Sequence, residues 1–122
     1  MTPVISEEHF IGLLDTLFLR GHEAYQAYLK NGRIYLYAKI IKTNNEKTLA
    51  LILDHCHLLP QIQQKNLMKL VLHLDVWTCQ WNDLRDRNNP CLTDEFVFET
   101  AVNFPKEAMA SLEGYFASKR SN

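Results

Sequence analysis

Residues 67–84 read LMKLVLHLDVWTCQWNDL and decide the fold of this chain. Large apolar side chains recur there at alternating steps of three and four: Leu67, Leu70, Leu74, Trp77, Trp81 and Leu84. This spacing places all six on one face of an α-helix. A second apolar strip, Met68, Leu72 and Cys79, predicts that the helix packs against several neighbours at once. We therefore predict that 61–86 is the central helix of the fold.

Helical spacing continues on both sides of this stretch. A serine followed by two glutamates at 6–8 predicts a helix start, and Asn-Gly at 31–32 predicts its end. Gly21 marks either a break in this first helix or a close approach by the central helix. The polar run at 43–45 predicts a second break, and proline near the start of 103–107 predicts the beginning of a last helix.

The segment 33–42, RIYLYAKIIK, fits two different structures. Its β-branched and aromatic residues favour a strand, and the strand-like segment within 95–102 would be its partner. Its apolar residues also fit helical spacing, and helices are expected on both sides. We predict a mainly α fold, a compact helical bundle around 61–86. The alternative is an α+β domain with a two-stranded element from 33–42 and 95–102.

Length and composition indicate one globular domain. A chain of 122 residues with 47% hydrophobic and 22% charged residues can bury a core, so we expect a single helical domain over 1–122. We expect frayed ends near 1–5 and 119–122. The sequence has no apolar run long enough to predict a membrane span. Its acidic start without a secretion pattern favours a cytoplasmic protein. Three cysteines without CxxC spacing argue against a disulfide framework.

Charge is unevenly distributed along the chain. Residues 33–72 contain six basic and two acidic residues, a net charge of +4, whereas residues 73–104 contain two basic and six acidic residues, a net charge of −4. Complementary charges of this kind steer association with a partner. The partner would be an acidic protein or the acidic part of a second copy of the chain.

One segment combines basic and aromatic residues and is our predicted partner-binding surface. It comprises Arg33, Tyr35, Tyr37, Lys39, Lys42 and Lys47. Tyrosine is enriched at protein interfaces, and the same mixture can bind a nucleic-acid strand. The isoelectric point near 6.5 is far below that of a nucleic-acid-binding domain and disfavours that partner.

Two places in the sequence could carry chemistry. Asp54-His55-Cys56-His57 consists entirely of residues that can bind a metal, but consecutive side chains on a helix point in different directions. Asp75 projects between the two apolar strips, where a carboxylate can act as an acid or base. The isolated glycines form no phosphate-binding loop, so we expect no catalytic site, metal or cofactor.

The sequence favours a small cytoplasmic protein-binding module, such as an adaptor, an inhibitor or a regulatory subunit. The basic, tyrosine-bearing segment would be its working surface. One alternative is a small enzyme or metal-binding protein that uses the Asp54–His57 cluster or Asp75. A second alternative is a nucleic-acid-binding regulator.

Overall fold

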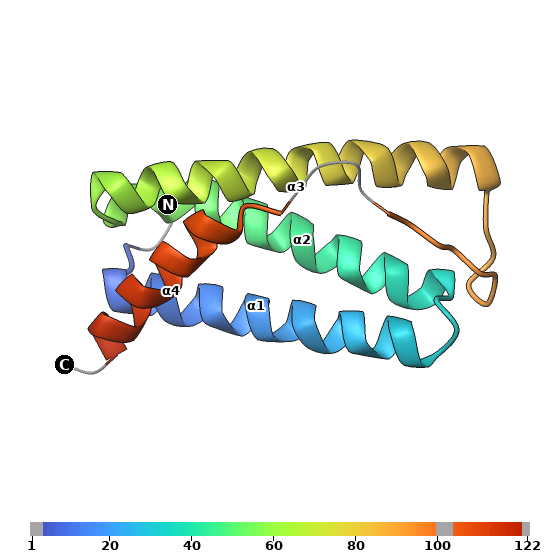
Figure 1. The fold of residues 1–122 in the computed structure, drawn as a ribbon, viewed down its shortest axis with the longest axis horizontal. Helices are drawn as coiled ribbons and strands as arrows, with labels where there is room; N and C mark the ends of the chain where they lie inside the picture. The colour runs from blue at the N-terminus through green and yellow to red at the C-terminus, as the bar shows by residue number, and fades with distance from the viewer. Residues whose placement is uncertain (1–3, 100–103, 121–122) are drawn as a thin grey trace.

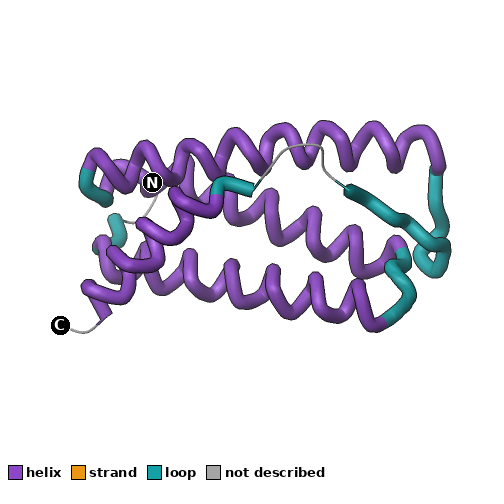
Figure 2. The backbone as a smooth tube through the Cα atoms, viewed as in Figure 1, coloured by secondary structure: helices purple, strands orange, loops and turns teal. Residues whose placement is uncertain are grey.

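Four α-helices make up most of the described chain, residues 4–99 and 104–120 of this computed structural model. They are α1 (Glu7–Lys30), α2 (Tyr35–His55), α3 (Gln61–Asn88) and α4 (Lys106–Arg120); a short 3-10 turn, η1 (Cys56–Leu58), joins α2 to α3. The three long helices run side by side, and the shorter α4 crosses them near one end (Figure 1). The described backbone consists of helices and loops (Figure 2). The predicted mainly α bundle is confirmed.

The helical prediction for 33–42 is confirmed from Tyr35 onward. Ile34 precedes the helix without a side-chain cap, and backbone carbonyls of the loop after α3 cap it instead. The Tyr35 N–H donates to Asp94 O at 2.8 Å, and the Leu36 N–H donates to Leu92 O at 2.9 Å. In place of the alternative two-stranded element from 33–42 and 95–102, the described residues form one isolated antiparallel bridge between Ile34 and Glu95. Residues 100–102 of that element lie outside the described chain.

The break predicted at 43–45 is wrong, because α2 passes through these residues without interruption. Asn44 is buried there, and its Nδ2 donates to the carbonyl of Leu17 on α1 at 2.9 Å. A contact between two helices thus uses the polar side chain that would otherwise favour a helix end. Gly21 on α1 is the site of a close approach, but the approaching helix is α2 rather than α3.

Replacing Gly21 with Ala should lower the free energy of unfolding by about 1 kcal/mol, although alanine favours helix formation. A Cβ atom at residue 21 would lie 2.9 Å from Asn44 Nδ2 and displace this buried side chain from Leu17 O. Gly12 on the same helix is the control: a Cβ there meets nothing within 4 Å. Gly12→Ala should instead stabilise by about 0.5–1 kcal/mol. Urea unfolding checks both signs, and a stabilised Gly21→Ala variant would contradict the prediction.

Two hydrophobic clusters form the core. The larger unites all four helices around Phe10, Ile52, Leu67 and Leu112, each 0% exposed. The smaller is aromatic and lies toward the other end of α3; its buried members are Tyr28, Tyr35, Ala38, Trp81 and Phe96. The stripe of 67–84 contributes to both clusters, as its spacing predicts.

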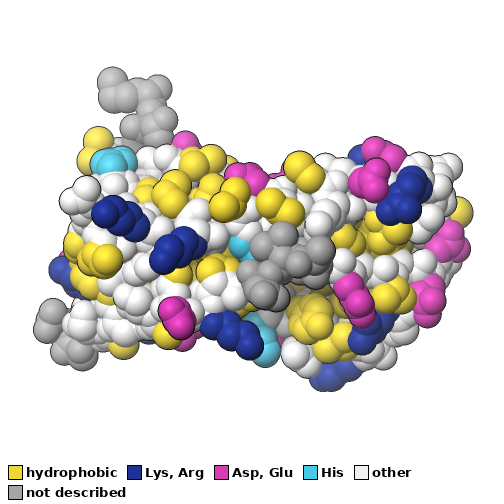
Figure 3. Space-filling view, turned by 45° about the horizontal axis from the view of Figure 1, so that its top comes forward, with side chains coloured by type: hydrophobic (Ala, Val, Ile, Leu, Met, Phe, Trp, Pro, Cys, Tyr) yellow, Lys and Arg dark blue, Asp and Glu magenta, His cyan; other side chains and the backbone are white. Residues whose placement is uncertain are grey.

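The second apolar strip of α3 is not part of the core. Leu72 is 65% exposed and Met68 is 41% exposed, and Cys79 is exposed as well. Hydrophobic side chains accordingly appear on the surface over α3 (Figure 3). The predicted helix 61–86 forms as α3 and extends two residues further, to Asn88. The helix that lies between two long neighbours is α2, which is flanked by α1 and α3 (Figure 1). None of the described helices combines the length and apolar character needed to cross a membrane.

We predicted fraying at 119–122, and the first two of these residues lie at the end of α4. Lys119 and Arg120 belong to α4, where they form ion pairs with Glu7 and Asp15 of α1. These pairs join the last turn of α4 to the first half of α1. Residues 1–3 and 121–122 lie outside the described chain.

Replacing Glu7 with Gln should destabilise the protein at neutral pH by about 0.5–1 kcal/mol. Burial opposes ionisation of Glu7, but hydrogen bonds from Tyr115 Oη at 2.7 Å and from the Lys119 ammonium at 3.0 Å outweigh it and lower the pKa of this carboxyl. A lowered pKa stabilises the fold above the unfolded-state pKa, and this contribution is lost as pH falls through the folded-state pKa.

The difference between the parent and Glu7→Gln should therefore shrink as pH falls below about 4. Urea unfolding of both proteins at several pH values measures it. Glu8→Gln, at the exposed neighbouring position, is the control. A difference that stays constant down to strongly acidic pH would contradict the assigned role of the Glu7 carboxylate.

Candidate functional site

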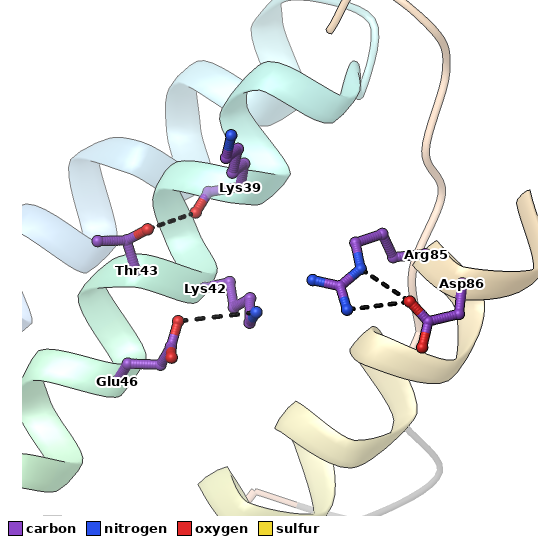
Figure 4. A network of polar contacts seen from close by, with 6 residues as sticks. All are labelled: Lys39, Lys42, Thr43, Glu46, Arg85 and Asp86. Carbon is purple, nitrogen blue, oxygen red and sulfur yellow. Dashed lines mark hydrogen bonds and ion pairs between the residues drawn. The ribbon is translucent and has the colours of Figure 1, made fainter. Parts of the chain in front are cut away.

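Trp81 on α3 lies close to two cationic side chains from different helices. Lys42 Nζ of α2 is 4.9 Å from the centroid of its ring, and Arg85 Cζ of α3 is 5.6 Å from it. Both distances fall within the range of cation–π attraction. Lys42 reaches from α2 toward α3, and Arg85 reaches back from α3 (Figure 4). We call Lys42, Arg85 and Trp81 the cation site; Lys39 lies one turn before Lys42 on α2.

The aromatic cluster holds the Trp81 indole in place from the side of the core. Its ring centroid is 5.1 Å from Phe96, 5.8 Å from Tyr35 and 6.5 Å from Trp77. Trp81 is 1% exposed, so its contacts allow little movement. The two cations are therefore positioned against a rigid apolar surface, which favours binding over a flexible arrangement.

The acidic side chains near the cation site compensate its charge only weakly. Lys42 Nζ is 3.8 Å from Glu46 Oε1, close to the limit for an ion pair. Arg85 donates to Asp86 Oδ1 at 2.9 and 3.1 Å, but Asp86 is the next residue and its side chain is 67% exposed. Lys39 is exposed and has no acidic partner among the described residues. The two carboxylate side chains, Glu46 and Asp86, are 54% and 67% exposed, so their attraction is screened by water and the site keeps a positive surplus.

Three buried polar atoms of α3 lie within one helical turn of each other and lack hydrogen-bond partners among the described residues. They are Trp81 Nε1, Thr78 Oγ1 and Asn82 Oδ1. A buried polar atom without a partner costs about 1–3 kcal/mol. This part of α3 therefore carries unsatisfied polarity in addition to the cations of Arg85 and Lys42.

The structure divides the predicted partner-binding surface. Lys42 lies in the cation site, and Lys39 is exposed one turn before it on α2. Arg33 precedes α2 and Lys47 lies further along it; both are exposed. Arg33 has a positive φ of 54° and bonds through its backbone, donating to Tyr28 O and accepting from Phe96 N.

The structure does not place the two tyrosines of the predicted surface, Tyr35 and Tyr37, fully at the surface. Tyr35 is buried at 8% exposure, and the half-buried Tyr37 packs against the same aromatic cluster. Helical periodicity turns Tyr35 toward α3, and Lys42, seven residues later, lies on the same face and also approaches Trp81. Lys39 stays exposed. The aromatic component of the cation site is therefore Trp81 and not a tyrosine.

Sequence reasoning missed Trp81 and Arg85 as members of a site. Trp77, Trp81 and Arg85 follow each other at steps of four, so they share one face of α3. We placed both tryptophans on the apolar stripe of 67–84, and we counted Arg85 within the acidic segment 73–104. The signal was the extension of an aromatic stripe by a basic residue.

The Asp54–His57 cluster does not converge on one point. Asp54 and His57 are exposed, while the half-buried His55 packs against Phe10 with ring centroids 6.0 Å apart. Burial raises the pKa of the Cys56 thiol, which makes it less reactive. Within residues 4–99 and 104–120, no three histidine, cysteine or acidic side chains come together in a way that could hold a metal ion.

Asp75 is exposed on the same outer side of α3 as Leu72, rather than at the edge of a covered strip. The predicted setting for an acid or base, a carboxylate between two apolar contacts, is therefore absent at this residue. The expectation failed because the Met68–Cys79 strip beside Asp75 is itself exposed.

Comparisons with known protein families, with curated proteins and with solved structures found no match for this chain. The function is therefore inferred from the described side chains themselves.

Proposed function

We propose that this chain is a small protein-binding module whose cation site docks an acidic segment of another protein. The observation that carries the proposal is the placement of Lys42 and Arg85 against one buried indole. Like charges held near each other repel, and an incoming carboxylate relieves this repulsion. A carboxylate also forms bidentate hydrogen bonds with a guanidinium such as that of Arg85.

The burial of the Lys42 side chain strengthens this proposal. It is 16% exposed, so it is partly desolvated before any partner arrives. Electrostatic attraction in such a place is stronger than between charges in open water. Lys39, one turn earlier and exposed, adds long-range attraction during the encounter.

A protein partner suits the chain better than a nucleic acid. The cation site is small, and the acidic residues of 73–104 would repel an extended phosphate backbone. We propose an adaptor, inhibitor or regulatory subunit that works in the cytoplasm. Its three unpaired cysteines, Cys56, Cys79 and Cys91, suit a reducing compartment. A second copy of the chain, with its acidic 94–99 segment, is a further partner of the same chemistry.

Reversing the charge of Lys39 and Lys42 should weaken binding of a short polyglutamate peptide by about tenfold or more. In a Trp77→Phe background, Trp81 is the only tryptophan, and its fluorescence reports binding at the site. The peptide should change this fluorescence in the parent background and do so more weakly as salt rises. Lys39→Glu with Lys42→Glu should reduce the response while leaving helix content unchanged.

The matched control reverses Lys65 and Lys69, two exposed lysines on α3, and should leave peptide binding unchanged. Equal losses in both variants would show non-specific attraction and contradict the proposal. A random single-stranded oligonucleotide is the second probe. If it binds more tightly than the peptide, with a steep linear dependence of log affinity on log salt, the nucleic-acid alternative replaces the protein-binding function.

A further inference from the structure

A partly open cavity of about 390 Å³ lies between all four helices and shares no lining residue with the cation site. Its apolar lining includes Leu17, Phe18, Ile41, Leu70, Leu74 and Met109. The volume is in the range of pockets that enclose small molecules, and clefts between the helices of a bundle are common places for them. A lining of this kind favours an apolar ligand, because burying apolar surface is favourable.

Two buried polar residues, Asn44 and Thr48, interrupt the apolar lining on the α2 side. Asn44 Oδ1 has no hydrogen-bond partner among the described residues. Thr48 Oγ1 donates its one hydrogen to Asn44 O at 2.9 Å, which leaves it only acceptor capacity. Both oxygens can therefore accept a hydrogen bond from a further donor.

The orientation of the Asn44 amide is fixed by α1. Its nitrogen faces the Leu17 carbonyl, which can only accept, and the missing side chain of Gly21 leaves room for that nitrogen. The oxygen is thereby directed away from α1. Asn44 is 2% exposed, so a donor has to enter the cavity to reach this oxygen.

We infer that this cavity binds a small apolar molecule with one hydrogen-bond donor, such as a phenol or an aliphatic alcohol. The apolar walls hold the body of the ligand, and its hydroxyl donates to the acceptor pair of Asn44 and Thr48. The two ionisable lining residues, His22 and Glu113, are exposed, whereas the buried pair of Asn44 and Thr48 carries no charge. The buried pair therefore suits a neutral donor rather than an ammonium group. This site is independent of the cation site and of its proposed partner.

The test compares two ligands of similar shape, para-butylphenol and para-butylanisole. In the anisole, a methyl group replaces the hydroxyl hydrogen, so the ligand has no donor. NMR titration of the full chain, followed at the methyl groups of Leu70 and Leu74, measures both affinities. The phenol should bind about tenfold more tightly, the effect of one buried hydrogen bond. Simple apolar partitioning would instead favour the anisole, so equal binding, anisole preference or no binding of either would overturn the inference.

Three variants locate the site. Leu17→Trp fills the cavity from a half-buried residue outside both core clusters and should abolish binding of both ligands. Leu13→Trp, one turn earlier on α1 at an exposed residue outside the cavity lining, should bind like the parent. Thr48→Val keeps the side-chain shape but removes an acceptor, so it should reduce the phenol preference about threefold or more. Binding that survives Leu17→Trp, or an unchanged preference in Thr48→Val, would contradict the assigned cavity or acceptor pair.

Discussion

Replacing Trp81 with Ala should lower the free energy of unfolding by about 3–5 kcal/mol, as large-to-small changes in a packed core do. Trp81 is 1% exposed and is in contact with Tyr35 and Phe96 at the centre of the aromatic cluster. Its removal would also take away the ring that Lys42 and Arg85 approach. Urea unfolding followed by far-UV circular dichroism measures the loss.

The control for Trp81→Ala is Leu72→Ala on the same helix. Leu72 is 65% exposed, so its truncation should change stability by no more than about 0.5 kcal/mol. Comparable losses in the two variants would mean that the outer strip of α3 is covered in solution. An unchanged Trp81→Ala would mean that the aromatic cluster contributes no stability to the bundle.

Replacing Phe10 with Ala should cost a similar amount, about 3–5 kcal/mol, at the opposite end of the molecule. Phe10 is 0% exposed and belongs to the cluster in which all four helices meet. If 1–122 is a single cooperative domain, circular dichroism and tryptophan fluorescence should both report one transition at the same, lowered urea concentration.

Leu13→Ala, one turn further along α1 at 39% exposure, is the matched control and should cost much less. Tryptophan fluorescence arises only from Trp77 and Trp81 in the aromatic cluster, far from Phe10 in the sequence. If fluorescence kept the parent midpoint in Phe10→Ala while circular dichroism shifted, the two clusters would unfold separately. The prediction of one domain would then be wrong.

The helices were predictable where the sequence pattern and the packing depend on the same residues. The stripe from Leu67 to Leu84 needed only helical periodicity, and Ser6 caps α1 as predicted, accepting from the His9 N–H at 3.0 Å. Pro60 directly precedes α3 with a φ of −57°, the value that a proline ring favours, so the start of this helix also depends on a local feature. Such features are local, so a single sequence contains them.

The failures involve contacts between residues distant in the chain. Asn44 belongs to a polar run that is typical of a helix break. Its side-chain amide instead donates to the carbonyl of Leu17, 27 residues away, and the helix continues. The same limit applies to the cation site, since no spacing within α2 shows that Lys42 meets Trp81. Nor does periodicity say which of two apolar strips stays exposed, as Met68 and Leu72 do.

The loop after α3 caps the start of α2, and this has a consequence for the order of folding. Tyr35 and Leu36 donate to carbonyls of Asp94 and Leu92, and Tyr28 Oη of α1 donates to Phe96 O at 2.6 Å. Closing so long a stretch of chain has an entropic cost, so local helical turns form more readily. A nascent chain that ends before residue 92 therefore lacks the carbonyl groups that accept from the Tyr35 and Leu36 N–H groups. This capping of α2 is completed only after α3 has been synthesised, although the residues of α2 emerge much earlier.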